Sequence, residues 1–217
     1  MDIPGMVQTL AIAALPVIFA ITLHEAAHGY AARYFGDPTA WLAGRISLNP
    51  LRHIELFGTI LLPVLLFVVG SPFLFGWAKP VPVDFGRLRH PKRDMLWVAA
   101  AGPAVNLLMA IGWGGMLKLD TLIPLNAYSH PLAVMCEIGI SINLALMVLN
   151  LLPLPPLDGG RIAVSLLPYT LAVKFSRIER WGFVILLVLL YFNILDYILW
   201  PFVGYFKEFI LFIFQLN

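Results

Sequence analysis

Charge and cysteine are both scarce in this sequence. Asp, Glu, Lys and Arg make up 12% of its 217 residues, whereas hydrophobic residues make up 60%, and the mean hydropathy is +0.87. Soluble domains usually carry about 25% charged residues. This composition therefore excludes an ordinary soluble protein and indicates a polytopic membrane protein. The net charge of +2 gives no sign of the basic surface that binds nucleic acid.

The sequence also lacks a disulfide framework and the pattern of a cleavable signal. Its single cysteine, Cys136, lies in an apolar stretch and has no partner in the chain. Residues 1–6 contain Asp2 but neither Lys nor Arg, whereas a secretory signal has a basic region before its apolar run. We therefore expect the first apolar run to remain in the mature protein.

Long apolar runs predict the membrane segments, because about 20 apolar residues can span a bilayer as a helix. Such runs cover residues 7–35, 57–75, 95–117, 132–152 and 181–195. The tail 197–217 is apolar but contains Lys207 and Glu208, which leaves a span, an interfacial helix and a broken helix open. We expect an all-α polytopic membrane protein with about five to six membrane segments.

One domain accounts for the whole chain, since no internal repeat or low-complexity tract divides it. We place this integral-membrane domain at residues 1–217, with a core at 7–161 and C-terminal segments at 162–217. Within the core, the stretch 76–85 carries Pro80 and Pro82, which exclude a helix and favour an extended or β element.

The first apolar run ends in an HExxH motif formed by His24, Glu25 and His28. On a helix this spacing places both imidazoles on one face, where they can bind one Zn²⁺. The adjacent glutamate can then take a proton from water that the metal activates. Ionisable groups at the end of a membrane segment are costly, so we expect these three to be functional.

Three motifs together resemble the site-2 protease family of intramembrane metalloproteases. They are His24-Glu25-x-x-His28, Ala101-Gly102-Pro103-x-x-Asn106 and Asn150-x-x-Pro153-x-Pro155-x-Leu157-Asp158-Gly159-Gly160. Further stretches, at 36–39, 48–54 and 76–83, resemble its compact prokaryotic branch without a PDZ domain. Only 14 residues, 118–131, separate the third and fourth apolar runs, and so short a connection cannot hold a PDZ domain. The resemblance covers residues 23–161, and residues 162–217 match nothing in it.

The resemblance implies that Asp158 is a third metal ligand. The chemistry agrees, because a catalytic zinc takes three protein ligands and keeps one position open. The alternative for Asp158 is an Asp-Gly turn that ends the preceding helix. We expect Gly159 and Gly160 to allow a sharp backbone turn that points the carboxylate inward.

Four further residues are candidates for substrate binding. The resemblance favours Asn150 as a residue that steadies the substrate or an oxyanion, and Asn106 is a second candidate. The alternative for both asparagines is hydrogen bonding between helices. Trp77 and Val81 lie in the extended stretch, which can clamp an extended substrate by edge pairing. For that stretch, the alternative is an interfacial turn with Trp77 as a headgroup anchor.

The orientation follows from the ligands. His28 and Asp158 must meet, and each follows an apolar run, so both run ends face one side. Segment 57–75 then starts and ends on that side, and we expect it to be re-entrant or to cross and return. The loops on this side hold 3, 5 and 4 Lys or Arg residues, which is 12 of the 14 in the chain: 33–56, 76–94 and 154–180. The positive-inside rule makes this side the cytoplasm.

The predicted function is that of a zinc endopeptidase in a prokaryotic inner membrane, which cleaves transmembrane segments with its active site toward the cytoplasm. It needs Zn²⁺, transmembrane protein substrates and the lipid bilayer, but no nucleic acid. One alternative is a metal-binding transporter, although such proteins spread ionisable residues over several spans. Another is an inactive protease-like protein that binds membrane partners, which has no need of Glu25.

Overall fold

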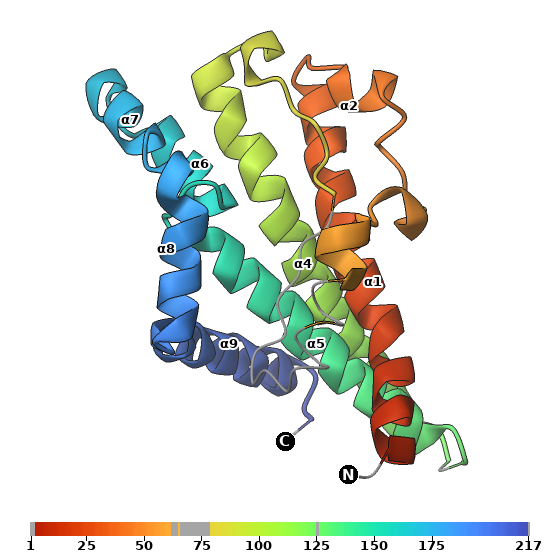
Figure 1. Cartoon of the computed structure of the whole chain (residues 1–217). Coiled ribbons are helices and arrows are strands. Elements are labelled where there is room, and N and C mark those ends of the chain that lie inside the picture. The colour runs from red at the N-terminus through yellow and green to blue at the C-terminus, as the bar shows by residue number, and fades with distance from the viewer. Residues whose placement is uncertain (1–2, 62–64, 66–78, 125, 217) are drawn as a thin grey trace.

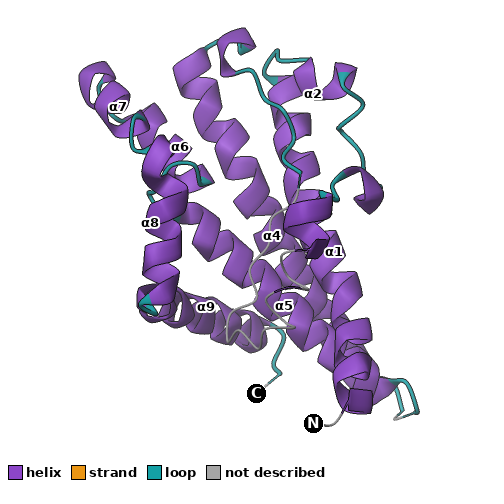
Figure 2. Ribbon diagram, viewed as in Figure 1, coloured by secondary structure: helices purple, strands orange, loops and turns teal. Residues whose placement is uncertain are grey.

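The computed structural model describes residues 3–61, 65, 79–124 and 126–216, and within these residues helices joined by loops are its regular secondary structure, with no strand (Figures 1 and 2). The long helices are α1 (Ile3–Tyr34), α4 (Pro91–Thr121), α5 (Ser129–Leu151), α8 (Glu179–Tyr191) and α9 (Ile194–Ile213). The short ones are α2 (Thr39–Leu42), η1 (Pro50–Arg52), η2 (Leu56–Leu61), η3 (Phe85–Arg87), α6 (Asp158–Leu166) and α7 (Tyr169–Ser176).

Among the described residues, three helices are long and apolar enough to cross a membrane: α1 from Ala11, α4 and α5. Helices α8 and α9 together make a fourth candidate that is bent by 83°. The all-helical class is thus confirmed, with three to four candidate spans. The expected five to six segments are not confirmed, and most of segment 57–75 lies outside the described residues.

Helix α4 is the centre of the bundle, because it packs against α1, α5, α6 and α9. Its contact with α5 forms the main apolar core, in which Ala110, Ile140 and Leu144 are fully buried. Small residues such as Ala110 let the helices approach closely, which is how helices associate where water does not drive burial. The packed α1–α4–α5 unit therefore supports the segments that lie at the ends of these helices.

One end of this bundle collects the segments that carry the motifs. The chain that leaves α1 and the chain that enters α4 lie together at this end, whereas the α4–α5 connection lies at the other end (Figure 1). Helix α6 begins where α5 has ended and packs on α4. The three motifs are thereby brought together although they are up to 134 positions apart in sequence (residues 24 and 158).

Residues 79–84, which we call the strap, run extended beside α1 and pair with no strand among the described residues. The expected β element is therefore not confirmed, although Pro80 and Pro82 do prevent a helix. Each proline lacks a backbone N–H, so the strap can offer only part of the hydrogen-bond ladder that a strand needs.

The turn that we expected at Gly159 and Gly160 is wrong, because both residues lie in the first turn of α6. Close packing explains the two glycines instead. A Cβ on Gly159 would lie 2.2 Å from the carbonyl oxygen of Leu151, and one on Gly160 would lie 2.3 Å from the nitrogen of Pro155. The end of α5 and the proline loop press on α6 at these points, and this contact fixes where Asp158 lies.

Candidate metal centre and active site

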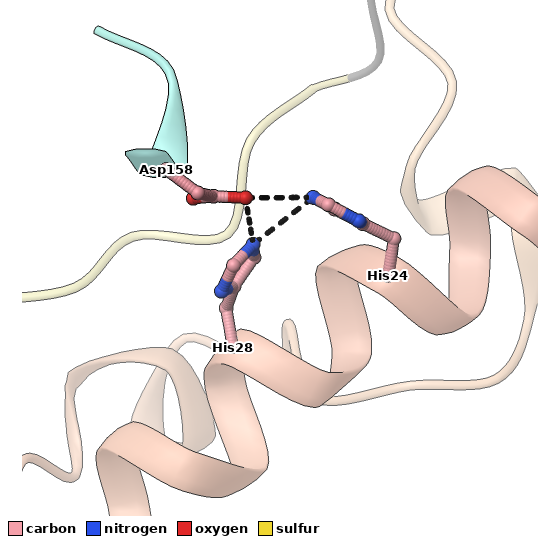
Figure 3. A group of neighbouring side chains, drawn as sticks. All are labelled: His24, His28 and Asp158. Atoms are coloured by element: carbon pink, nitrogen blue, oxygen red, sulfur yellow. Dashed lines mark hydrogen bonds and ion pairs between the residues drawn. The ribbon is translucent and has the colours of Figure 1, made fainter. Parts of the chain in front are cut away.

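The side chains of His24, His28 and Asp158 meet at one point (Figure 3). His24 Nε2 lies 3.1 Å from His28 Nε2 and 3.2 Å from Asp158 Oδ2, and His28 Nε2 lies 3.3 Å from that same oxygen. The histidines are one turn apart on α1, and Asp158 is the first residue of α6. The three residues that the sequence predicts as metal ligands therefore lie together in the structure.

The donor set fits a zinc ion. Zinc binds imidazole nitrogen and carboxylate oxygen at about 2.0–2.1 Å with tetrahedral geometry, which places ligand atoms about 3.3 Å from one another. The three atoms form a nearly equilateral triangle of that size. The Oδ2 atom of Asp158 is buried, and apart from the Nε2 atoms of the two histidines it has no partner among the described residues. Such an oxygen is costly unless a cation binds it.

Each histidine is held through its other ring nitrogen. The Nδ1 of His28 donates to the carbonyl oxygen of Val98 at 2.8 Å, and the Nδ1 of His24 lies 2.6 Å from Asn106 Oδ1. Both partners belong to α4. Metal-binding histidines usually have such a second partner, which orients the ring.

Gly102 lets α4 come close enough to make these contacts. A Cβ at this position would lie 2.5 Å from His28 Nε2 and 2.6 Å from His24 Cε1. Real Cβ atoms do not approach other heavy atoms so closely, so only glycine fits here without moving the imidazoles. The Gly102-Pro103 pair of the second motif thus belongs to the packing around the metal centre.

A cavity of about 210 Å³ is lined by these three residues and by Glu25. Its lining also includes residues of the strap, η3, α4, α5, α6 and the loop between α5 and α6: Pro80, Val81, Val83, Phe85, Val98, Ala99, Asn150, Pro156, Leu157 and Arg161. One carboxylate oxygen of Glu25, Oε2, accepts a hydrogen bond of 2.7 Å from the backbone N–H of Val81. The strap therefore touches the candidate general base directly.

The strap is tied to the loops that follow α1. The N–H of Lys79 donates to the carbonyl of His53 at 2.9 Å, and Arg45 donates to the carbonyl of Lys79 at 2.8 Å. At its other end, the N–H of Asp84 donates to Asp37 Oδ2 at 2.7 Å.

Asp37 is fully buried and serves as the anchor for the strap's C-terminal end. Burial by itself would raise the pKa of Asp37, but hydrogen bonds from the side chain and backbone of Thr39 and from the backbone of Asp84 lower the pKa below its ordinary value. The carboxylate thus stays ionised, and the ionised form strengthens the hydrogen bonds that it accepts from the backbone N–H groups of Thr39 and Asp84.

Of the four residues predicted to bind substrate, two line the cavity, one contacts a histidine and one lies outside the described residues. Asn150 lines the cavity, and its Nδ2 donates to the carbonyl of Leu146 at 2.9 Å. Val81 also lines the cavity, whereas Asn106 contacts His24 and is not among the described lining residues. Trp77 lies outside the described residues.

Sequence analysis missed Arg161 and Asp37. Arg161 lies three positions after Asp158 on α6, a spacing that places both on one helix face, so that signal was available. Its guanidinium carbon lies 4.9 Å from the centre of the Phe85 ring. Asp37 lies in the stretch 36–39 that carries part of the family resemblance, but its role as an anchor was not evident, because Gly-Asp-Pro is also the sequence of an ordinary turn.

A helical membrane bundle with two histidines and a carboxylate around one point, and a glutamate in the adjoining cavity, is typical of membrane-embedded hydrolytic metalloenzymes. Known proteins agree. The model of peptidase family M50 matches residues 113–192. YwhC of Bacillus subtilis, named as a candidate zinc metalloprotease, is 40% identical over 190 residues, which is 86% of this chain and 83% of that protein.

Two relatives named Rip2, also candidate zinc metalloproteases, are more distant. The protein from Mycolicibacterium smegmatis is 31% identical over 178 residues, covering 80% of this chain and 64% of that protein. The protein from Mycobacterium tuberculosis is 31% identical over 146 residues, covering 65% of this chain and 52% of that protein. No solved structure matches the chain. The chain belongs to peptidase family M50, which confirms its resemblance to the site-2 proteases.

Proposed function

We propose that this chain is an intramembrane zinc endopeptidase that hydrolyses peptide bonds within or near the transmembrane segments of other membrane proteins. The observation that carries the proposal is the triangle of His24, His28 and Asp158 beside Glu25 in one cavity. The alternative of a transporter is not favoured, because the relatives are named as zinc metalloproteases.

His24, His28 and Asp158 would hold the zinc ion, with one position left for a reactant. A zinc ion bound there acidifies a water molecule and polarises the carbonyl of the scissile peptide bond. The carboxylate of Asp158 would lower the net charge of the zinc site below that of a bare Zn²⁺, because the two imidazoles are neutral. A lower charge reduces the cost of placing the site within the membrane.

Glu25 is the proposed general base. It follows His24 directly and shares the cavity, so its carboxylate can take the proton of the attacking water and pass it to the leaving amine. The N–H of Val81 holds one oxygen of this carboxylate at 2.7 Å. This bond fixes the orientation of the carboxylate within the cavity.

The strap is the proposed substrate wall. Val81, Val83 and Phe85 are spaced two apart, and all three line the cavity. An extended chain turns alternate side chains to one face, so Val81 and Val83 offer an apolar strip along which an unwound substrate can lie, and Phe85, the first residue of η3, follows them on the cavity wall. A helical substrate must unwind first, since its peptide bonds are engaged in its own hydrogen bonds. Asn150 lines the cavity and is the proposed contact for the substrate or an oxyanion.

The active site is proposed to face the cytoplasm. The motif-bearing end of the bundle holds 12 of the 14 Lys and Arg residues, counted over 33–56, 76–94 and 154–180. The hydrogen bond between Lys79 and His53 supports a common side, because it joins the two ends of the segment between them. The residues that flank segment 57–75 would therefore lie on the same side of the membrane.

Thiol labelling tests this orientation. Cys136 is replaced by Ala, single cysteines are placed at Ser47 and Arg89, and a membrane-impermeant reagent is applied to intact cells and to inside-out vesicles. Both sites should react only in the vesicles. Reaction from opposite sides would contradict the orientation and the common side of the two flanks.

Mass spectrometry of membrane fragments tests the activity. Wild-type protein and Glu25→Gln are reconstituted with the same membrane-protein substrates, and the new termini are mapped. An amide cannot take a proton from water, so we expect cleavage to fall about 10²–10⁴-fold while zinc content stays the same. Cleavage within a few-fold of wild type would remove Glu25 from the mechanism.

A further inference from the structure

A chain of buried amides connects the metal centre to two other helices. Asn106 on α4 and Asn143 on α5 are both fully buried. The Nδ2 of Asn106 donates to Asn143 Oδ1 at 2.9 Å and to the carbonyl of Ala20, on α1, at 3.2 Å. The Nδ2 of Asn143 donates to the carbonyl of Gly139 at 2.8 Å. The Oδ1 of Asn106 completes the chain at His24 Nδ1.

The two backbone carbonyls fix the direction of every bond in this chain, because a carbonyl oxygen can only accept. The carbonyl of Gly139 requires the NH₂ group of Asn143, whose Oδ1 must then face Asn106. The carbonyl of Ala20 likewise requires the NH₂ group of Asn106. The oxygen of Asn106 is therefore the atom at His24, and the ring nitrogen 2.6 Å away must donate.

The consequence for His24 is a single tautomer. A neutral imidazole that donates from Nδ1 carries its lone pair on Nε2. That Nε2 is the atom that lies in the triangle with His28 and Asp158. The opposite tautomer would direct an N–H at the position of the metal and leave two acceptors facing each other at Asn106.

We propose that Asn106 and Asn143 act together as a positioning relay that sets the tautomer and the ring orientation of His24 for zinc. The proposal rests on the proposed function, since it assumes that zinc binds at the triangle. Asn106 is then a positioning residue and not a contact for substrate. His28 needs no such residue, because its Nδ1 donates directly to the carbonyl of Val98.

A merely structural role for the two asparagines would also be reasonable, because amides often join helices within membranes. The two roles differ in which atom of residue 106 matters. A structural link depends on the two bonds that Nδ2 donates, whereas the relay depends on the oxygen that accepts from His24. A variant of residue 106 that keeps the acceptor oxygen but loses the NH₂ group therefore separates the two roles.

The decisive measurement is zinc affinity, obtained by competition with a chromophoric chelator on folded, monodisperse protein in detergent. Asn106→Leu removes the acceptor and should weaken zinc binding about 10–100-fold, the usual effect of losing such a partner. Asn106→Asp keeps an acceptor for His24 Nδ1 and should stay within a few-fold of wild type, even where its thermal stability falls. Asn143→Leu should have an intermediate effect.

The matched control is Ser165→Ala, which removes a buried hydroxyl that donates to the carbonyl of Ile162 within α6. Its zinc affinity should equal that of wild type. Equal affinity in Asn106→Leu, or a loss in Asn106→Asp as large as that in Asn106→Leu, would overturn the relay. Failure of wild-type protein to bind zinc would instead overturn the proposed function.

A second measurement decides the matter where Asn106→Leu does not fold. The ¹⁵N chemical shifts of His24 in metal-free wild-type protein, assigned by comparison with His24→Gln, report which ring nitrogen carries the proton. The relay requires the proton on Nδ1. A proton on Nε2 would overturn it.

Discussion

The two walls of the cavity are built in different ways. The helical wall carries His24, Glu25 and His28 on α1 and is held from behind by buried partners on α4 and α5, of which Asn106 and Asn143 are fully buried. The strap wall has no partner strand among the described residues and depends on separate hydrogen bonds to loops. Pro80, Pro82 and Asp84 on the strap are exposed.

This difference separates the chemistry from the recognition of substrate. Metal ligands must keep their positions to within a fraction of an ångström, which packed helices with a supporting shell provide. A substrate wall must admit chains of varied sequence, and the strap is held by a few separate hydrogen bonds, each worth about 0.5–3 kcal/mol. We therefore expect changes in the helical wall to remove zinc and activity together, and changes in the strap to reduce activity alone.

The largest effect should come from Gly102→Ala in the helical wall. The new Cβ would lie 2.5 Å from His28 Nε2, so α4 or the imidazole must move, at a cost of about 1–3 kcal/mol for overpacking. We expect loss of most bound zinc and of cleavage, measured by metal analysis and fragment mapping. The control is Gly112→Ala on the same helix, where a Cβ meets no atom within 4 Å. Full zinc in Gly102→Ala would show that this wall is less rigid than we infer.

A smaller effect should come from Val81→Pro in the strap. Proline removes the N–H that donates to Glu25 Oε2, and hydrogen bonds to charged groups are worth about 1.5–3 kcal/mol. Cleavage should therefore fall about 10- to 100-fold while zinc content is unchanged. Val81→Ala keeps the N–H and serves as the comparison: it shortens a side chain of the proposed substrate wall, so cleavage should fall by less than in Val81→Pro. Loss of zinc in Val81→Pro would break the separation between the walls.

The helical wall was largely predictable from the sequence. The spacing of His24 and His28 dictates that both imidazoles share a helix face, and the family resemblance implies Asp158, in agreement with the need of a catalytic zinc for a third ligand. The packing role of Gly159 and Gly160 was not predictable from the sequence. Their packing against Leu151 and Pro155 depends on how α6 meets the end of α5, which no local pattern contains.

The strap was predictable only as an extended segment. Pro80 and Pro82 exclude a helix, but nothing in the sequence indicates that the N–H of Val81 binds Glu25, 56 positions earlier. The anchor at Asp37 was missed for the same reason, since Gly-Asp-Pro favours a local turn whatever the carboxylate binds. The role of Asn106 depends on the orientation of its amide, and that orientation follows from carbonyl groups on two other helices.

The central claim is that His24, His28 and Asp158 bind the zinc with which Glu25 acts. Its most direct test is the zinc content per folded protein molecule of wild type, Asp158→Ala and Glu25→Gln, with cleavage measured on the same preparations. We predict about one zinc in wild type and in Glu25→Gln, a large loss in Asp158→Ala, and cleavage only by wild type. Full zinc and full cleavage in Asp158→Ala would contradict the claim.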